Sequence, residues 1–273
     1  MATATTLSAG ELRQIIDLVY RRSGIALHDG KRELVQARLS KRLHQLRLET
    51  PADYLRYLEA DTSGQEMTSF IDMMTTNHTS FFREAAHFAY LRDVVVPERR
   101  GVAGGATLEG WCAACSTGEE PYTIAVTLLD AGDTRFRLLA SDLSSRALAQ
   151  ASSGVYRLDR VSSVPRPVLK KYFERGLGEQ DGLARVAPSV RRLVQFQQLN
   201  LLEVGHLQRT FDFIFCRNVM IYFDLPVRQR VVAMLVRHLA PGGYLFIAHS
   251  ENLTGIDHGL RRVAPSVFKR AEA

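Results

Sequence analysis

The chain has 273 residues, too many for one small domain and too few for three ordinary ones, so we expect one or two domains. Its 46% hydrophobic and 23% charged residues, with a formal net charge of +6, are typical of a soluble globular protein. No apolar stretch is long enough to span a bilayer, and the first residues lack the basic start and apolar run of a secretory signal. Three cysteines, an odd number, argue against a disulfide framework, so we expect a cytoplasmic protein.

The first part of the chain predicts a small bundle of four short helices. Ser8 is a suitable cap for a first helix that Gly24 ends, and Pro51 suits the first turn of a third helix. A fourth helix is predicted over about residues 65–74. The apolar spacing of the second segment predicts one buried side, made by Leu34, Val35, Leu39, Leu43 and Leu46.

Residues 31–47 form a basic patch in which six basic residues face a single acid, Glu33. Lys31, Arg38 and Arg42 share one side of the predicted helix because they lie seven and then four residues apart. Such a patch predicts an acidic partner, which nucleic acid, anionic lipid or an acidic protein would each satisfy. Charge alone does not choose among these, and an ordinary solvated helix face is the alternative.

From about residue 108 the pattern changes to short apolar runs that alternate with helical segments. This alternation predicts an α/β fold with a parallel sheet covered on both sides, and ligands of such sheets bind beyond the carboxyl ends of the strands. The alternation breaks between about residues 155 and 198, where several glycines and short β-like segments follow one another. We interpret this stretch as an inserted β subdomain separate from the main sheet.

Two of these apolar runs end in residues suited to binding a ligand. The first ends in small residues and Gly118, followed by Glu119 and Glu120, where the backbone can approach a ligand and an acid can accept its hydrogen bonds. The alternative is a tight turn whose two acids favour a helix N-terminus. The second ends in Asp142, which is placed to accept a ribose hydroxyl or, alternatively, to cap the next helix.

Long, specific motifs follow one another in a fixed order over nearly the whole chain. They are TTNHTSFFRE at 75–84, CSTGEEPY at 115–122, ASD at 140–142, LNLL at 199–202, FCRNVMIYF at 215–223 and HSEN at 249–252. Taken together, these motifs closely resemble the chemotaxis receptor methyltransferase (CheR-type) family.

The resemblance implies a small all-α domain in front of a Rossmann-like methyltransferase domain that binds S-adenosylmethionine. We place the helical, receptor-docking domain at residues 1–75 and a linker that contributes to the cofactor site at 76–94. The methyltransferase domain then covers 95–273, with the inserted β subdomain at about 160–198.

The family resemblance also implies the residues that bind S-adenosylmethionine and its product S-adenosylhomocysteine. Glu119 or Glu120 resembles the acid near the methionine amino group, and we favour Glu119. Asp142 resembles the ribose-binding acid. The other implied cofactor contacts are Asn77, Thr79 and Arg83 in the linker, Asn200 and Leu201 at the adenine, and Arg217 and Asn218 beyond the fourth strand.

The activity that the resemblance implies is methyl transfer to glutamate side chains of chemoreceptors, which serves sensory adaptation. A glutamate with a reference pKa of about 4.3 is already an anionic nucleophile at neutral pH, so no general base is needed. Arg83 and Tyr222 are the candidates for orienting this carboxylate. The alternatives are an ion pair of Arg83 with Glu84 or Glu119 and a half-buried core aromatic at Tyr222.

The family resemblance gives the basic patch a partner, because family members dock the acidic methylation helices of receptors through this segment. Arg38, Lys41 and Arg42 are the predicted docking residues. The loop with Gly176, Gly178 and Gly182 resembles the loop that binds a pentapeptide at the receptor's C-terminus, by addition to a sheet edge. A plain surface hairpin is the alternative for this loop.

Several other functions fit the sequence less well. Cys112 and Cys115 form a CxxC pair, but with only Cys216 remaining they lack the ligands of a zinc site, so we predict buried cysteines and no metal. A nucleic-acid methyltransferase is disfavoured because Asn218–Tyr222 lacks the prolines of the amino-methylating motif and no aromatic residues interleave with the basic patch. A non-enzymatic cofactor sensor is the remaining rival. We expect a monomer that neither binds nucleic acid nor inserts into a membrane.

Overall fold

The structure is a computed structural model that describes residues 7–27, 29–102, 107–205 and 207–272. Residues 1–6, the start of the predicted helical domain, lie outside the described part. The chain divides into two compact units. A helical unit contains the described residues up to Thr76 together with Tyr222–Val227, and a catalytic unit contains Asn77–Ile221 and the chain from Arg228 onward. Within the described ranges, no helix has both the length and the apolar character needed to cross a membrane.

The helical unit consists of short amphipathic helices whose ends follow local sequence signals. Ser8 and Glu11 form a capping box at the first helix, and Gly24 closes it in the left-handed conformation with φ 73°, both as expected. Thr50 caps the third helix and Pro51 occupies its first turn. The helices are α1 (Ala9–Ser23), η1 (Asp29–Lys31), α2 (Arg32–Leu46), α3 (Pro51–Ala60) and α4 (Gln65–Met74).

The buried side of α2 is narrower than the sequence predicted. Val35, Leu39 and Leu43 are buried, whereas Leu34 is 37% exposed, so its assignment to the apolar side was wrong. Residues 35, 39 and 43 are spaced by four, which forms one stripe along the helix, and Leu34 lies about 100° away from Val35 around its axis.

A buried polar cluster ties α2 to α3 and α4. Glu66 is 5% exposed, and its carboxylate accepts hydrogen bonds from Arg42 Nε at 2.9 Å and from the Tyr54 hydroxyl at 2.7 Å. Arg42 also pairs with the second oxygen of Glu66. Because a buried carboxylate needs partners for its charge, Arg42 has a structural task inside this unit.

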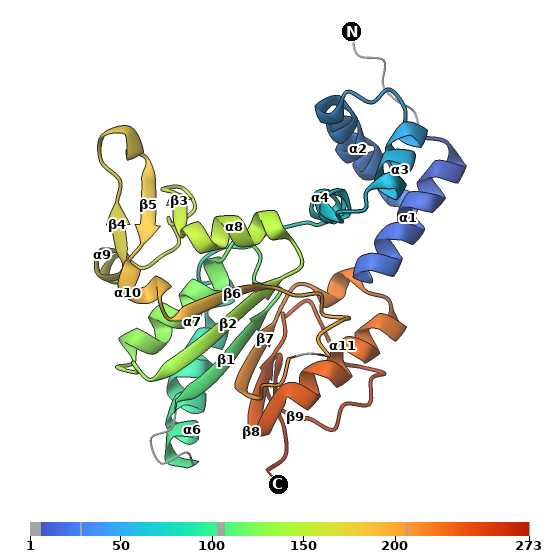
Figure 1. Cartoon of the computed structure of the whole chain (residues 1–273). Helices are drawn as coiled ribbons and strands as arrows, with labels where there is room; N and C mark the ends of the chain where they lie inside the picture. The colour runs from blue at the N-terminus through green and yellow to red at the C-terminus, as the bar shows by residue number, and fades with distance from the viewer. Residues whose placement is uncertain (1–6, 28, 103–106, 206, 273) are drawn as a thin grey trace. The chain divides into compact units, whose positions relative to one another are not determined.

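The described residues of the catalytic unit form a seven-stranded sheet with the order β6-β2-β1-β7-β8-β10-β9 (Figure 1). The first five strands of this order are parallel, and β10 and β9 complete the sheet as antiparallel strands. The order reverses between β1 and β7, which makes their carboxyl ends the place to look for a ligand. The strands are β1 (Leu108–Ala113), β2 (Phe136–Asp142), β6 (Val194–Gln198), β7 (Phe211–Cys216), β8 (Leu239–Phe246), β9 (Arg261–Ala264) and β10 (Val267–Lys269).

Both faces of this sheet are covered, as the apolar strand sequences predicted. On one face, Phe88 stacks on Phe215 at 5.7 Å between ring centroids. On the other, Trp111 contacts the ring of His238, which lies on α11, at 5.9 Å. The helices and helical turns of this unit are α5 (Ala86–Tyr90), the π-helical turn η2 (Leu91–Val95), α6 (Val96–Val102), α7 (Glu119–Asp130), α8 (Ser145–Ser153), α9 (Arg166–Tyr172), η3 (Gly178–Gln180) and α10 (Pro188–Arg191). The unit also contains the start of η4 (Met220–Tyr222) and most of α11 (Leu225–His238), whose residues 222–227 belong to the helical unit.

The inserted β subdomain is real, but its predicted limits of about 160–198 were wrong at both ends. Its sheet has the order β3-β5-β4 and begins before residue 160, with β3 (Val155–Arg157), β4 (Phe173–Arg175) and β5 (Leu183–Val186). Strand β6 belongs instead to the main sheet, where it pairs in parallel with β2. Its polar sequence misled the prediction because an edge strand needs fewer apolar residues than a central strand.

Candidate functional site

The linker around Arg83 and the loops at the carboxyl ends of β1 and β7 contain strained backbone. A positive φ is uncommon for residues with a side chain, and such conformations cluster at binding and catalytic sites. Here they flank the linker arginine and follow the two strands. The residues are Phe82 (φ 55°), Glu84 (57°), Ala114 (65°), Ser116 (50°) and Asn218 (58°).

Gly118 closes the turn after β1 and begins α7. Its φ is 95°, and a Cβ at this position would lie 2.8 Å from Ala151 Cβ and 2.8 Å from the Tyr156 hydroxyl. Only glycine therefore fits, because Ala151 and Tyr156 of this chain lie against the turn. Close approach of this backbone to a ligand stays a prediction.

Glu119, directly after this turn, is fully buried and its carboxylate is held on two sides. Oε2 accepts a hydrogen bond from the Thr117 hydroxyl at 2.6 Å, and Oε1 pairs with Arg160. Arg160 also donates to the backbone carbonyl of Thr79 in the linker at 3.1 Å, and its side chain is 40% exposed. Arg160 thus covers the carboxylate from the solvent side.

Glu120 belongs to a different network, centred on Arg217. The Arg217 side chain has no exposed surface and pairs with Glu120 at 2.6 Å and with Glu84 at 2.9 Å. It also donates to the backbone carbonyl of Arg83 at 2.7 Å. Burial opposes the charge of Arg217, but the two carboxylates raise its pKa above the ordinary value. Burial likewise opposes ionisation of Glu84, yet Arg217 holds the pKa of that carboxyl below its usual value.

The side chain of Asp142 organises the tip of β2. Its oxygens accept hydrogen bonds from the backbone N–H of Ser116 at 2.7 Å and of Ser144 at 2.9 Å. The cap of α8 is Ser144, so Asp142 is not the helix cap that the alternative interpretation supposed. The carboxylate instead holds the β1 and β2 loops together, and it is 8% exposed.

The turn after β7 is held by Glu251, a residue of the HSEN motif to which the sequence assigned no role. Its carboxylate accepts hydrogen bonds from the backbone N–H groups of Asn218 at 3.1 Å, Met220 at 2.8 Å and Ala248 at 2.9 Å. Burial raises the pKa of Glu251, and these N–H groups oppose that rise by stabilising the anion. The carboxylate therefore fixes the left-handed backbone of Asn218.

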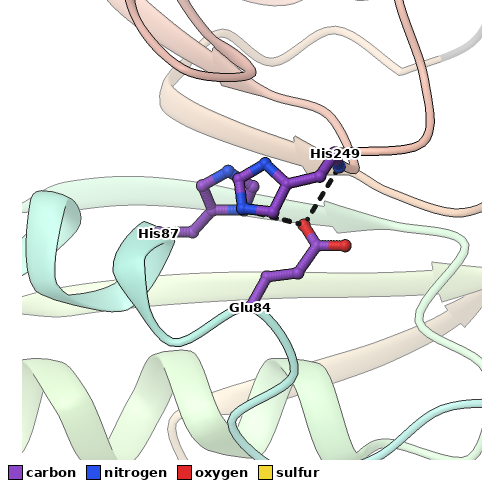
Figure 2. Close-up of side chains that lie close together, drawn as sticks. All are labelled: Glu84, His87 and His249. Atoms are coloured by element: carbon purple, nitrogen blue, oxygen red, sulfur yellow. Dashed lines mark hydrogen bonds and ion pairs between the residues drawn. The ribbon is translucent and has the colours of Figure 1, made fainter.

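Two histidines lie beside Glu84 (Figure 2). His87 Nδ1 is 3.5 Å and His249 Nε2 is 3.9 Å from Glu84 Oε2. His87 is 1% exposed, and burial together with the neighbouring Arg217 lowers its pKa to about 4, so the ring is neutral near pH 7.

Arg83 makes neither of the ion pairs that the alternative interpretation offered. Within the described residues, its side chain donates to the carbonyl of His78 at 3.1 Å and pairs with no carboxylate. Asn77 and Thr79 are half-buried in the same linker. Asn200 accepts a hydrogen bond from the Leu202 N–H at 3.1 Å. Leu201 lines a groove of about 930 Å³ beside α11.

Tyr222 belongs to the helical unit, and the other predicted cofactor and catalytic residues belong to the catalytic unit. Its side chain is half-buried, and its backbone carbonyl accepts a hydrogen bond from the Ala26 N–H at 2.8 Å. An isolated β-bridge between Ile25 and Phe223 fixes this segment to the helices.

The three predicted docking residues differ in their surroundings. Arg42 is engaged with Glu66, and Arg38 donates to the Met74 carbonyl at 2.7 Å and to the Thr76 hydroxyl at 3.2 Å. Lys41 is exposed and makes no hydrogen bond or ion pair within the described residues.

The predicted glycine loop connects β4 to β5. Gly178 and Gly182 adopt φ of 60° and 85°, which other residues rarely do. A Cβ at Gly176 would lie 2.0 Å from the carbonyl oxygen of Gln180. The loop thus needs its glycines for its own shape.

Two functional candidates, Arg160 and Glu251, escaped the sequence-based predictions. Arg160 follows no recognisable motif, and only its contact with Glu119 reveals it. Glu251 carries a weak signal, because it lies in HSEN directly after a strand of the sheet, where ligand-binding loops are expected.

The site fits the groups of S-adenosylmethionine. Asp142 has a carboxylate at the tip of β2 that is suited to hydroxyl groups, and Glu119 is a buried carboxylate suited to an ammonium group.

Comparison with known proteins agrees with this geometry. Residues 77–267 match the family model of the CheR methyltransferase SAM binding domain, and residues 10–75 match that of the CheR methyltransferase all-alpha domain. The chain is 42% identical to chemotaxis protein methyltransferase 2 of Pseudomonas aeruginosa, over 96% of this chain and 93% of that protein. It is also 42% identical to the chemotaxis protein methyltransferase of Salmonella typhimurium, over 94% and 88%.

Among solved structures, the S-adenosylmethionine-bound amino pentose methyltransferase CalS10 from Micromonospora echinaspora aligns with a TM-score of 0.35 and 18% identity. This alignment covers 67% of this chain and 54% of that one.

Fold, site and matched domains define an S-adenosylmethionine-dependent methyltransferase with an all-α domain in front of the cofactor-binding domain. The chain belongs to the CheR family of chemotaxis methyltransferases. The sequence-based prediction of family, fold class and cofactor is therefore confirmed.

Replacing Gly118 by alanine tests the turn after β1. A left-handed residue with a Cβ costs about 1–2 kcal/mol, and overpacking against Ala151 and Tyr156 adds about 1–3 kcal/mol. We therefore expect Gly118→Ala to lower the free energy of unfolding, measured in urea, by about 2–5 kcal/mol. Gly132, with φ 75° and open space around it, is the matched control. Gly132→Ala should lower the free energy of unfolding only by the cost of the left-handed backbone, about 1–2 kcal/mol. Equal losses at both positions would contradict the close packing at Gly118.

Glu251→Gln tests whether the carboxylate holds the β7 turn. The amide offers one acceptor oxygen to three N–H donors, so at least one buried donor loses its partner at a cost of about 1–3 kcal/mol. We expect faster hydrogen exchange at the amides of Asn218 and Met220 together with a lower unfolding temperature. Glu179→Gln, the same change at an exposed loop position, should alter neither quantity. Wild-type exchange in Glu251→Gln would show that the turn holds without the carboxylate.

Proposed function

We propose that the chain transfers the methyl group of S-adenosylmethionine to glutamate carboxylates of chemoreceptor cytoplasmic domains, forming methyl esters. The observation that carries the proposal is the state of the charges around the linker. Glu84 and Glu120 are paired with Arg217, and Glu119 is paired with Arg160. Among the described residues of this linker and site, Arg83 is the arginine whose side chain contacts a carbonyl and no carboxylate. It is available for an incoming anionic acceptor.

The proposed reaction needs no proton transfer by the protein. Bound S-adenosylmethionine supplies a methyl group that its sulfonium already activates. The acceptor carboxylate is anionic at neutral pH, with a reference pKa of about 4.3, so no residue has to remove a proton. The tasks of this chain are to orient the carboxylate through Arg83 and the Tyr222 hydroxyl and to exclude water. A carboxylate held too tightly is a poorer nucleophile, so the contact with Arg83 has to loosen as the new bond forms.

The cofactor contacts remain part of the proposal. Glu119 is our choice for the amino group, because Glu120 is committed to the buried Arg217 network while Glu119 meets a cation from the solvent side. Asp142 would accept ribose hydroxyls, and Asn200 and Leu201 would contact the adenine. Asn77, Thr79 and Arg83 would close over the cofactor, with Arg217 and Asn218 lining the far side.

Docking of the receptor is proposed for the basic surface of α2. Among the residues that the structure describes, Lys41 is an exposed cation of this surface without a partner, whereas Arg38 and Arg42 are partly committed within the helical unit. An acidic helix on the receptor would complement this surface. We also propose that the protein acts in the cytoplasm.

The loop between β4 and β5 suits the proposed receptor pentapeptide. Strand β4 lies at an edge of the β3-β5-β4 sheet, so its outer side can accept an added strand. The glycine loop beside it, with Gly176, Gly178 and Gly182, would shape the end of that edge.

The activity test uses the purified chain with methyl-labelled S-adenosylmethionine and receptor-containing membranes, following base-labile label. We expect label on receptors, a turnover about 10²-fold lower in Arg83→Ala, and about tenfold lower in Tyr222→Phe. Arg166→Ala and Tyr57→Phe, the same changes at exposed positions, should keep wild-type turnover. Calorimetry with S-adenosylhomocysteine confirms that each variant is folded and binds.

Cofactor binding without label on any folded receptor would overturn the proposal and favour a cofactor sensor. Label on DNA or RNA in parallel incubations would favour a nucleic-acid methyltransferase instead.

Docking is tested by Lys41→Glu, which should raise the KM for receptor about three- to fivefold, the size of one exposed charge pair, with an unchanged kcat. The effect should fade as salt is added, because exposed charges are screened. Lys170→Glu, the same change on exposed α9, should leave KM unchanged. An equal rise in both variants would mean that overall charge, and not α2, governs the encounter.

A further inference from the structure

Glu84, His87 and His249 bring three potential metal ligands together from two distant parts of the sequence. Glu84 and His87 lie in the linker at the start of α5, and His249 follows β8 (Figure 2). One ligand atom from each residue lies within 4.8 Å of the others. His87 and His249 have ring centroids 4.7 Å apart, and Figure 2 shows both rings beside the Glu84 carboxylate.

His87 is a buried imidazole with few hydrogen-bonding partners, as expected of a metal ligand in the absence of its metal. The residue is 1% exposed, and within the described residues its ring nitrogens have only weak partners, the backbone of Pro265 and Glu84 Oε2 at 3.5 Å from Nδ1. Burying an imidazole without a strong partner carries a free-energy cost, which coordination of a cation by Nδ1 would remove.

The other two residues also resemble parts of a metal site. The Nδ1 atom of His249 lies 3.2 Å from the Ser266 hydroxyl, an interaction that orients the ring and leaves Nε2 facing Glu84. Oε2 of Glu84, the oxygen from which both ring distances are measured, accepts hydrogen bonds from Arg217 at 2.9 Å and from the His249 N–H at 3.2 Å. A cation bound at this oxygen would take the place of the longer of these two contacts. Hydrogen bonds of this kind, to the second ring nitrogen and to the carboxylate, are usual around metal ligands.

The charges of the cluster permit a divalent cation. Arg217 contributes one positive charge, and Glu84 and Glu120 contribute two negative charges. The network therefore carries a net negative charge before any cation binds.

We propose that Glu84, His87 and His249 form a binding site for a Zn²⁺-class transition-metal ion. Two imidazoles and one carboxylate are a ligand set typical of zinc with an open fourth position. Tetrahedral bonds of about 2.0–2.1 Å place ligand atoms about 3.3–3.4 Å apart, close to the observed 3.5 and 3.9 Å. A movement of the His249 side chain, which is 45% exposed, would shorten the 3.9 Å distance to the tetrahedral value.

Such an ion would connect the linker to the loop after β8. The linker residue next to Glu84 is Arg83, and the loop contains Glu251, which holds the Asn218 turn. A metal at this position would thus stiffen both sides of the proposed acceptor site. The site is distinct from the CxxC cysteines, which are buried and protonated because burial raises the pKa of both thiols.

The test measures metal binding directly and needs neither cofactor nor receptor. The chelator-treated, untagged full-length chain is titrated with Zn²⁺ by calorimetry and with Co²⁺ by visible absorption. We expect one saturable site per chain and a Co²⁺ spectrum of the intense four-coordinate type. His249→Ala should weaken Zn²⁺ binding about tenfold or more, because it removes one of three ligands.

His44→Ala is the matched control, since it removes an exposed histidine of α2 and should leave the affinity unchanged. His87→Gln adds a second ligand variant, and thermal unfolding without metal shows whether each variant is folded. Absence of saturable binding to the wild-type chain would overturn the proposal. So would equal Zn²⁺ affinity in the wild-type chain and in folded His249→Ala. Neither result would bear on methyl transfer, which is measured separately.

Discussion

The buried guanidinium of Arg217 is the interaction on which the site depends. It joins the turn after β7 to two other parts of the unit, the linker through Glu84 and the backbone carbonyl of Arg83, and the start of α7 through Glu120. Because the guanidinium has no exposed surface, water cannot replace a lost partner. The charge of Arg217 therefore depends on both carboxylates, and their charges depend on Arg217. The ion pair between Glu84 and Arg217 therefore fixes the linker that carries Arg83 to the sheet. Removal of Arg217 would leave uncompensated carboxylates in the interior.

This arrangement explains why strained backbone is tolerated where it occurs. Glu84 adopts a left-handed conformation beside Arg83, and its carboxylate is bound by Arg217. Asn218, directly after Arg217 in the chain, is left-handed as well, and Glu251 binds its N–H. A left-handed residue with a side chain costs about 1–2 kcal/mol, which hydrogen bonds to charged groups, worth about 1.5–3 kcal/mol, can offset. The conformations that shape the site are stabilised by charged partners a long way off in sequence, Arg217 for Glu84 and Glu251 for Asn218.

How much could be predicted from the sequence follows from the range of the interactions. Caps are local, so Ser8, Gly24 and Pro51 marked their helix ends correctly. The motif loops followed from strand alternation and family resemblance. The predicted burial of Leu34 was wrong because one step around a helix decides whether a side chain is buried. The assignment of β6 to the inserted subdomain was wrong because the sequence of an edge strand is polar. Partners such as Arg160 for Glu119, and His249 for Glu84, come from segments that only folding brings together.

The pairing of Glu119 shows how such a site can be stable before it binds anything. A fully buried carboxylate without a cation would destabilise the fold, and Arg160 supplies the cation. Arg160 is 40% exposed, however, so it can return to water at little cost once an ammonium group takes its place. Arg217 has no such freedom, because its whole side chain is buried. The two neighbouring acids Glu119 and Glu120 therefore differ in their partners. Glu120 pairs with the fully buried Arg217 and stabilises the fold, whereas Glu119 pairs with the partly exposed Arg160, which a cationic ligand can displace.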